Sequence, residues 1–246
     1  KRGIRLLAHS VLRRVQKRVG TANAIRMQNY VHKVLGRRSR FDVSRSGQWF
    51  YVVSNHNGRV SHWHFSELHR GFDLYSFGIR SRAQHLAQSY SLDLVPLVSG
   101  DVVVDCGANY GDLGAGFPPG FDFANYITFE PSPREHAMLR LNHPEAQHFQ
   151  SALSDTDGEQ KLYLSTATAD SSLTNPGEFT EILVVPTIRF DTFARQNGIS
   201  NVGLFKLEAE GHEPEVLRGM SDSLRFIRYI AADGSRERGT HQEETL

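Results

Sequence analysis

The stretch "GDVVVDCGANYGDLG", residues 100–114, decides the fold of this chain. Three valines lead to Asp105, and glycines follow at positions 107, 111 and 114. A buried strand that ends in a glycine turn is typical of the first strand of a parallel α/β sheet, where ligands bind outside the carboxyl ends of the strands. Gly107 has no Cβ, so the backbone can bend sharply there and approach a ligand. We therefore expect Asp105 and Gly107 to belong to a ligand site.

A second acidic residue, Glu130, ends the next expected strand, "NYITFEP", 25 positions after Asp105. A carboxylate at this place suits the two hydroxyls of an adenosine ribose, because each hydroxyl donates a hydrogen bond to it. Gly107 and Gly111 are four apart, so the G-x-G-x-x-G pattern of dinucleotide sites is missing. The two acids and the glycine turn together favour a nucleoside cofactor.

The next helix has a clear start, with Ser132 as its N-cap, Pro133 at its first position and Glu135 completing a capping box. Downstream, apolar β-branched runs alternate with helical patterns, which predicts a parallel α/β sheet. The expected strands are at 148–154, 160–166, 182–190, 202–211 and 225–234, and the expected helices are at 132–142, 191–198 and 213–220.

The strand "VGLFKLEAEG" carries charged residues inside an apolar run. Lys206 and Glu208 share one face of it, and buried charges are costly unless they are paired or hydrated. One interpretation is a structural ion pair near the end of the strand. The other is that Glu208, Glu210 and His212 converge beside the cofactor at the carboxyl edge of the sheet.

The first 40 residues form a basic segment, with 12 Lys or Arg and no Asp or Glu. The rest of the chain has 16 basic and 27 acidic residues. Within the segment, Ile4, Leu7, Val11, Val15 and Val19 recur at helical spacing, and 25–36 repeats the pattern more weakly. Such a helix could dock on the acidic body or on a second copy, lie on anionic lipid, or hold a nucleic-acid backbone. The acidic body makes nucleic acid the least favoured partner.

Between this segment and the sheet, 41–66 predicts short strands with a turn at 57–58. A helix follows, with Ser81 as its N-cap. We expect three parts: a basic helical arm at 1–40, a β-rich segment at 41–80 and an α/β domain at 81–246 that is truncated at its C-terminal end. The histidines of the β-rich segment and its flank have no metal-ligand spacing and are expected to be surface or packing residues: His56, His62, His64 and His69.

The composition indicates an ordinary soluble protein of 246 residues with a mean hydropathy of −0.41. No apolar run reaches the roughly 18 residues of a membrane span. The single cysteine, Cys106, excludes a disulfide within the chain, so a reducing cytoplasmic location is expected, with peripheral membrane contact as an addition through the arm. Cys106 lies in the apolar run and is expected to pack as a small buried hydrophobe.

Five blocks of this sequence, taken in order, resemble the FkbM-type S-adenosylmethionine-dependent methyltransferases. They are "VVVDCGANYGDLG", "ITFEPSPREHAMLRLN", "ALSDTDGE", "VPTIRFDTFARQNGI" and "LFKLEAEGHEPEVLRGM", within residues 95–233. The resemblance implies a Rossmann-like sheet with helices on both faces. It also implies S-adenosylmethionine as cofactor and methyl transfer to a hydroxyl of a sugar, glycan or related natural product.

Position by position, the resemblance assigns roles to individual residues. Asp105, Gly107 and Asn109 match the cofactor loop, and Glu130 matches the ribose-binding acid. Ser151, Ala152 and Leu153 fall where the adenine is bordered. The block K-x-[DE]-x-E-G-x-E, whose acids line the acceptor side, is matched by Lys206, Glu208, Glu210, Gly211 and Glu213.

The acceptor hydroxyl must lose a proton, and we expect Glu210 to take it, with His212 and Glu208 as alternatives. The sequence departs from the family in "GDLGAGFPPGFDF", where glycines and prolines weaken the helix expected after the glycine loop. A non-catalytic nucleoside- or membrane-binding module on the same fold therefore stays open as an alternative. The oligomeric state is also open.

Overall fold

A computed structural model describes residues 11–12, 14–36, 39–44, 47–54, 60–98, 100–164, 172–174 and 179–233. The chain divides into two compact units, Lys1–Arg82 and Ala83–Leu246. The finer boundary expected at residue 40 stays a prediction. No helix among the described residues combines the length and the apolar character that a membrane crossing needs.

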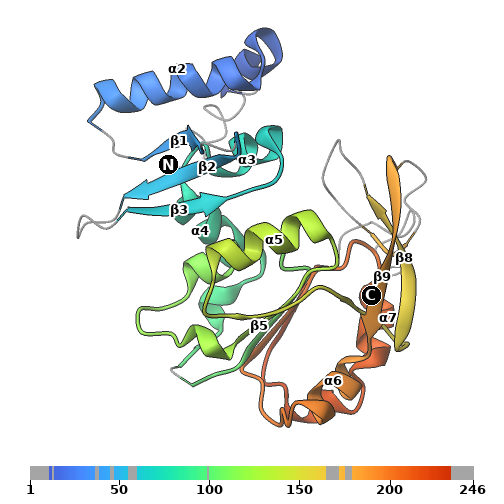
Figure 1. Ribbon diagram of the computed structural model, residues 1–246. Coiled ribbons are helices and arrows are strands. Elements are labelled where there is room, and N and C mark those ends of the chain that lie inside the picture. Colours follow the sequence, from blue (N-terminus) through green and yellow to red (C-terminus); the bar gives the residue numbers. More distant parts are fainter. Residues whose placement is uncertain are drawn as a thin grey trace. The chain divides into compact units, whose positions relative to one another are not determined.

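The N-terminal unit contains a small antiparallel sheet with helices (Figure 1). Its elements are α2 (Thr21–Val34), β1 (Arg40–Val43), β2 (Trp49–Ser54), β3 (Val60–His64) and α3 (Leu68–Tyr75), with residues 11–12 and 14–19 also helical. Its core is aromatic, with buried Phe41, Tyr51, Phe65, Phe72 and Tyr75 in mutual contact. The short strands expected in this region are present. Ile4, Leu7, His56 and the turn at 57–58 lie outside the described residues.

Helix α4 (Ile79–Ser89) runs across the boundary between the units. The expectation that Ser81 is its N-cap is wrong, because the helix begins two residues earlier. Gly78, with φ 89°, provides the turn into the helix, and the Ser81 N–H already donates to the Gly78 carbonyl. A short 3₁₀ turn, η1 (Leu92–Leu94), follows it.

The C-terminal unit is built on a five-stranded parallel sheet flanked by helices, which confirms the expected Rossmann-like fold class. Its strands are β4 (Val103–Cys106), β5 (Tyr126–Phe129), β6 (Gln147–Phe149), β10 (Leu204–Leu207) and β11 (Ile230–Ala232), in the order β11-β10-β4-β5-β6. The chain moves from β4 outward to β6 and then returns to the other side of β4. The strand order therefore reverses between β4 and β10, where a crevice at the carboxyl ends is expected.

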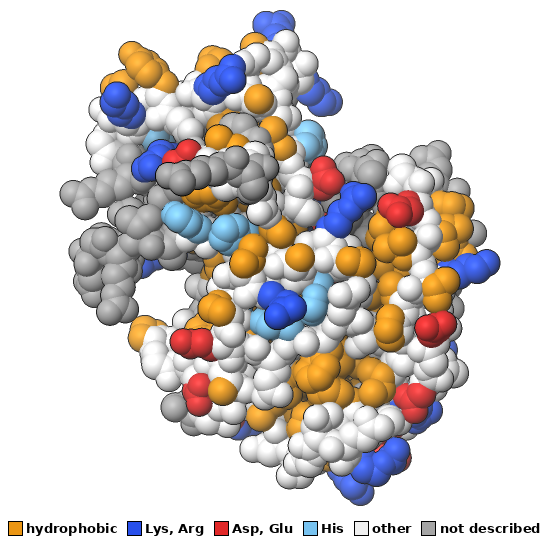
Figure 2. All heavy atoms as spheres, viewed as in Figure 1, with side chains coloured by type: hydrophobic (Ala, Val, Ile, Leu, Met, Phe, Trp, Pro, Cys, Tyr) orange, Lys and Arg blue, Asp and Glu red, His pale blue; other side chains and the backbone are white. Residues whose placement is uncertain are grey.

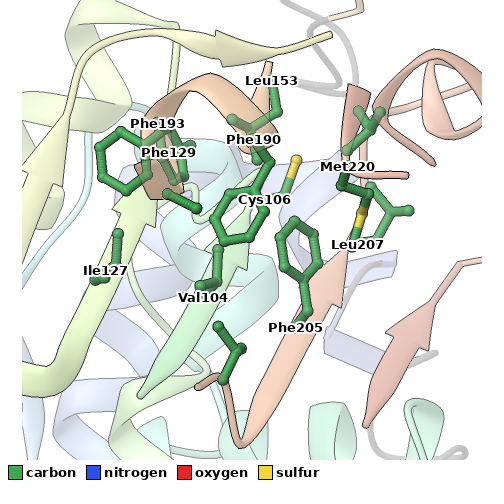
Figure 3. Close-up of a cluster of buried hydrophobic side chains, with 13 residues drawn as sticks. Val104, Cys106, Ile127, Phe129, Leu153, Phe190, Phe193, Phe205, Leu207 and Met220 are labelled. Atoms are coloured by element: carbon green, nitrogen blue, oxygen red, sulfur yellow. The ribbon is translucent and has the colours of Figure 1, made fainter. Parts of the chain in front are cut away.

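One face of this sheet is covered by α6 (Phe190–Gln196) and α7 (Glu213–Gly219). Alternate residues of three strands point to these helices and form a closed apolar cluster (Figure 3). Cys106 is part of the cluster and is 4% exposed, so its expected role as a buried hydrophobe is confirmed. Burial raises the pKa of its thiol far above the usual value, which keeps it unreactive.

The other face is covered by irregular segments on both sides of β4, including residues 90–97 and 113–123. After the glycine turn the chain forms only the 3₁₀ turns η2 (Gly114–Gly116) and η3 (Phe123–Asn125). Glycines and prolines there prevent the long helix that the fold usually has, as the sequence predicted. The next regular helix is α5 (Pro133–Asn142), which contacts β6.

A second, three-stranded sheet is inserted between β6 and β10. It consists of β7 (Ala152–Leu153), β8 (Gly158–Leu164) and β9 (Glu181–Ile188), in the order β7-β9-β8. The single strand expected at 148–154 is therefore wrong. The chain leaves the main sheet after Phe149 and pairs with β9 from Ala152 onward. The last elements are η4 (Ser223–Phe226) and β11.

Candidate functional site

The glycine turn after β4 has a backbone that only particular residues adopt. Gly107, Asn109 and Gly111 all have positive φ, at 73°, 50° and 82°. A Cβ on Gly107 would lie 1.9 Å from the Glu208 carbonyl oxygen, at the end of β10. The turn is thus fixed between β5, whose Phe129 carbonyl accepts from the Gly107 N–H, and β10.

Glu130 joins this turn to the start of α5. One of its carboxylate oxygens accepts from the Asn109 N–H at 2.8 Å, and the other accepts from the Ser132 N–H at 2.9 Å. Burial, followed by the nearby Glu135 carboxylate, raises the pKa of Glu130 to about 7. A carboxylate has about four acceptor positions, and these two N–H groups use only two of them.

The capping box at Ser132 differs from the expected one. Ser132 is the N-cap and Pro133 follows it, as predicted. However, the Ser132 N–H is taken by Glu130 rather than by Glu135, and the Ser132 hydroxyl donates to the Glu135 carboxylate. The Glu130 carboxylate, at the end of the preceding strand, occupies the position from which Glu135 would accept this hydrogen bond. The helix start is therefore coupled directly to the expected ribose-binding acid.

Lys206 lies at the centre of a buried charge cluster between β4 and β10. It is the register partner of Asp105, and its Nζ lies 3.1 Å from Asp105 Oδ1 and 2.8 Å from Glu208 Oε2. The same Nζ donates to the Gly107 carbonyl at 2.7 Å. Burial acts to lower the pKa of Lys206, but the charges of Asp105 and Glu208 outweigh it and hold this pKa well above its usual value. The ammonium thus fixes the glycine turn.

Asp105 is 1% exposed and faces protein groups. Its Oδ2 accepts from the Tyr126 hydroxyl at 2.5 Å, and its Oδ1 forms the ion pair with Lys206 without accepting a well-directed hydrogen bond from a described residue. This burial favours a role in which Asp105 holds Lys206. Direct contact of Asp105 with a cofactor stays a prediction.

Tyr90, just after α4, is a member of the cluster that sequence reasoning missed. Its side chain hydrogen-bonds Glu208, and Lys206 Nζ lies 5.9 Å from the centre of its ring. Burial, above all, raises the pKa of Tyr90 well above its usual value, so its hydroxyl stays protonated and donates. Tyr90 precedes every recognised motif, and no local pattern marks it.

The turn after β10 carries the other acidic residues of the motif. Glu210 has φ 49°, a left-handed conformation that is unusual for a residue with a side chain, and Gly211 has φ 89°. Glu213, which is fully buried, accepts from the Ala209 N–H and closes the turn.

Two residues outside the motif also hold this turn. Ser172 Oγ donates to the Glu210 carbonyl at 2.6 Å, and Thr174 Oγ1 donates to the Gly211 carbonyl at 3.2 Å. No local pattern marked Ser172 or Thr174 either. The backbone of the Glu210 turn is therefore supported from a distant part of the chain.

His212 points into the protein rather than toward the glycine turn's charge cluster. It is 7% exposed, its Nε2 lies 3.0 Å from Ser154 Oγ, and its Nδ1 lies 3.6 Å from Glu215 Oε2. Both ring nitrogens thus face protein partners. This arrangement favours Glu210 over His212 as the candidate base.

The residues expected to border an adenine follow β6, next to Glu130. The Glu130 N–H donates to the Phe149 carbonyl, so the segment from Phe149 to Leu153 passes beside the ribose-type acid. Ala152 and Leu153 are buried in β7, and Ser151 is half-buried. Their expected contact with a cofactor stays a prediction. Among the described residues, no group of three or more His, Cys, Asp or Glu side chains could hold a metal ion.

Residues 105–241 match the Methyltransferase FkbM domain family. The hexuronic acid methyltransferase AglP of Haloferax volcanii is 26% identical over 139 residues, which cover 54% of this chain and 55% of that protein. The 2-O-methyltransferase NoeI of Sinorhizobium fredii is 26% identical over 153 residues, which cover 54% of this chain and 63% of that protein. The matches thus span between half and two thirds of each curated relative.

Proposed function

Because this chain belongs to the FkbM methyltransferase family, we propose that it transfers a methyl group from S-adenosylmethionine to a hydroxyl oxygen of a sugar or glycan. The two relatives support the acceptor class by their names, one for a hexuronic acid and one for 2-O-methylation. The single observation that carries the proposal is Glu130, whose carboxylate is held by two N–H groups beside a glycine turn.

The residues at this edge fit an adenosyl ligand. Glu130 retains two acceptor positions, which suit the two ribose hydroxyls. Asn109 Oδ1 is buried and accepts no hydrogen bond from the part of the chain that is described, so it offers an acceptor for a ligand donor. Positive φ at Gly107 and Gly111 shapes the turn, and the lack of a Cβ makes room for the Glu208 carbonyl and for the side chains of α5 and His143. Ser151 to Leu153, which follow β6 beside Glu130, are proposed to border the adenine.

The cofactor supplies an electrophilic methyl carbon when it is bound. The chain positions the acceptor oxygen for in-line attack on that carbon, and most of the rate enhancement is expected from this positioning. Lys206, held between Asp105 and Glu208, keeps the glycine turn and the end of β10 at a fixed separation. Tyr90 and Lys206 both contact Glu208, so this carboxylate is oriented and suited to hold an acceptor hydroxyl in place.

Glu210 accepts the proton of the acceptor hydroxyl as the new carbon–oxygen bond forms. Its left-handed backbone supports this role, because strained conformations persist where the surrounding structure enforces them, often at functional sites. Ser172 and Glu213 help to enforce it through the hydrogen bonds of the turn.

The test has two readouts, binding of S-adenosylhomocysteine by calorimetry and its release during turnover with sugar and glycan acceptors. We expect Glu210→Gln to lower turnover at least a hundredfold while affinity for S-adenosylhomocysteine is unchanged. Glu159→Gln, on the exposed side of β8, is the matched control and should leave both readouts unchanged. Binding without turnover on any acceptor would instead favour the non-catalytic module, and no binding would refute the proposal.

A further inference from the structure

Helix α2 has a buried face of mixed character and an outward face that is apolar. One face is buried in the N-terminal unit and contains Ala24, Ile25, Gln28 and His32. The other face is directed outward and contains Met27, Tyr30, Val31 and Val34, followed by Leu35. These outward residues, called the α2 stripe below, are between 50% and 69% exposed, and four of them follow the i, i+3, i+4, i+7 spacing of one helix side.

The buried face already fixes α2 to its own unit by specific hydrogen bonds. Gln28 Nε2 donates to the Ser76 carbonyl at 2.6 Å, and His32 Nδ1 lies 2.8 Å from the Ser39 carbonyl. Asn29 makes two bonds with the Phe41 backbone, one as donor and one as acceptor. Docking of the helix within the unit therefore does not use the α2 stripe.

The α2 stripe is bordered by positive charge. At about 100° per residue, exposed Arg26 and Lys33 fall beside Tyr30 along one edge of the stripe. Hydrophobic and basic side chains lie next to one another over α2 (Figure 2). They belong to a segment of 40 residues with 12 Lys or Arg and no acidic residue. Isolated surface hydrophobes are normal, but a contiguous row with a basic border marks an interaction surface.

We propose that the α2 stripe binds an anionic lipid surface, with its apolar side chains in the headgroup boundary and its basic residues at the lipid phosphates. Apolar area and electrostatic attraction act together in such binding, and tyrosine is favoured at the boundary. A nucleic-acid backbone would use the charges but leave the row of Met27, Val31 and Val34 without a partner.

The test measures partitioning of the full chain onto phosphatidylcholine vesicles with and without phosphatidylglycerol, by co-sedimentation. We expect binding to the anionic vesicles only, and weaker binding at high salt. The combined change of Met27, Val31 and Val34 to Ser should lower the partition coefficient by about a hundredfold. Arg26→Gln with Lys33→Gln should lower it by about thirtyfold.

The matched control changes two exposed apolar residues of β9, Ile182→Ser and Val184→Ser, and should partition like the unchanged protein. All variants should keep the circular dichroism spectrum and the affinity for S-adenosylhomocysteine. Absence of anionic-vesicle binding, or equal binding by the stripe variant, overturns the proposal. Two further results also overturn it: a dimer that the stripe variant converts to a monomer, and binding to single-stranded RNA in place of vesicles.

Discussion

Replacing Gly107 by Ala should lower the stability of the fold and disrupt the proposed cofactor site. The new Cβ would lie 1.9 Å from the Glu208 carbonyl oxygen, so the turn must move by more than 1 Å to reach an ordinary contact. Movement on this scale breaks the bond from the Glu208 N–H to the Cys106 carbonyl and the bond from Lys206 Nζ to the Gly107 carbonyl. A neutral bond contributes about 1 kcal/mol and a charged one about 1.5–3 kcal/mol. The positive φ costs a side chain a further ~1–2 kcal/mol.

Gly198 provides the matched control, because its φ is 67° but no atom lies within 4 Å of a Cβ placed there. Gly198→Ala should therefore lower the free energy of unfolding by only about 1–2 kcal/mol, against about 4 kcal/mol or more for Gly107→Ala. Urea unfolding measures the difference in stability between the two variants. Calorimetry should show that only Gly107→Ala loses affinity for S-adenosylhomocysteine. If the two variants were equally stable, the close approach of the glycine turn to β10 would be refuted.

Three further predictions concern Glu130, Lys206 and Tyr90. Because the pKa of Glu130 is raised to about 7, its carboxylate is protonated below that pH, and affinity for S-adenosylhomocysteine should fall about tenfold per pH unit below 7. The Glu130→Gln variant should bind weakly at every pH. If its affinity still fell with pH in the same way, Glu130 would be excluded as the source of the pH dependence. Lys206→Met leaves Asp105 as an uncompensated buried charge and should lower the free energy of unfolding by about 3–5 kcal/mol, as measured with urea. Adding Asp105→Asn should restore much of this stability. If the effects of the two substitutions were additive instead, the pairing of Lys206 with Asp105 would be excluded. Tyr90→Phe removes the hydroxyl that hydrogen-bonds Glu208, so kcat should fall at unchanged affinity for S-adenosylhomocysteine; an unchanged kcat would exclude Tyr90 as a positioning residue.

The features that the sequence predicted are those with a local cause. The glycine turn, the acid that ends β5 and the proline-marked start of α5 each depend on residues within a few positions of one another. Positive φ at Gly107 and Gly111 can be expected from the residue type alone, because only glycine adopts it freely. The absence of a regular helix over 114–123 follows from glycines and prolines in the same way.

The features that could not be predicted depend on contacts between distant parts of the chain. The burial of Asp105 could not be predicted, because it follows from the register that pairs this residue with Lys206, about a hundred positions later. Tyr90 and Ser172 lie far in sequence from the residues that they contact, Glu208 and Glu210. The altered capping box at Ser132 is an exception with a local cause, because Glu130, two positions earlier, accepts from the N–H that Glu135 was expected to bind.

Lys206 in β10 and Glu208 just after it explain how a buried strand carries charge into the proposed site. Lys206 would be unstable in an apolar strand by itself, since burial disfavours its charge. Ion pairs with Asp105 and Glu208 stabilise the charged form of Lys206. Its ammonium group in turn donates hydrogen bonds to the carbonyls of Cys106 and Gly107. The three residues therefore stabilise one another only when β4 and β10 are in register. Because that register also sets the distance from the glycine turn to Glu208, correct folding and the geometry of the proposed site depend on the same contacts.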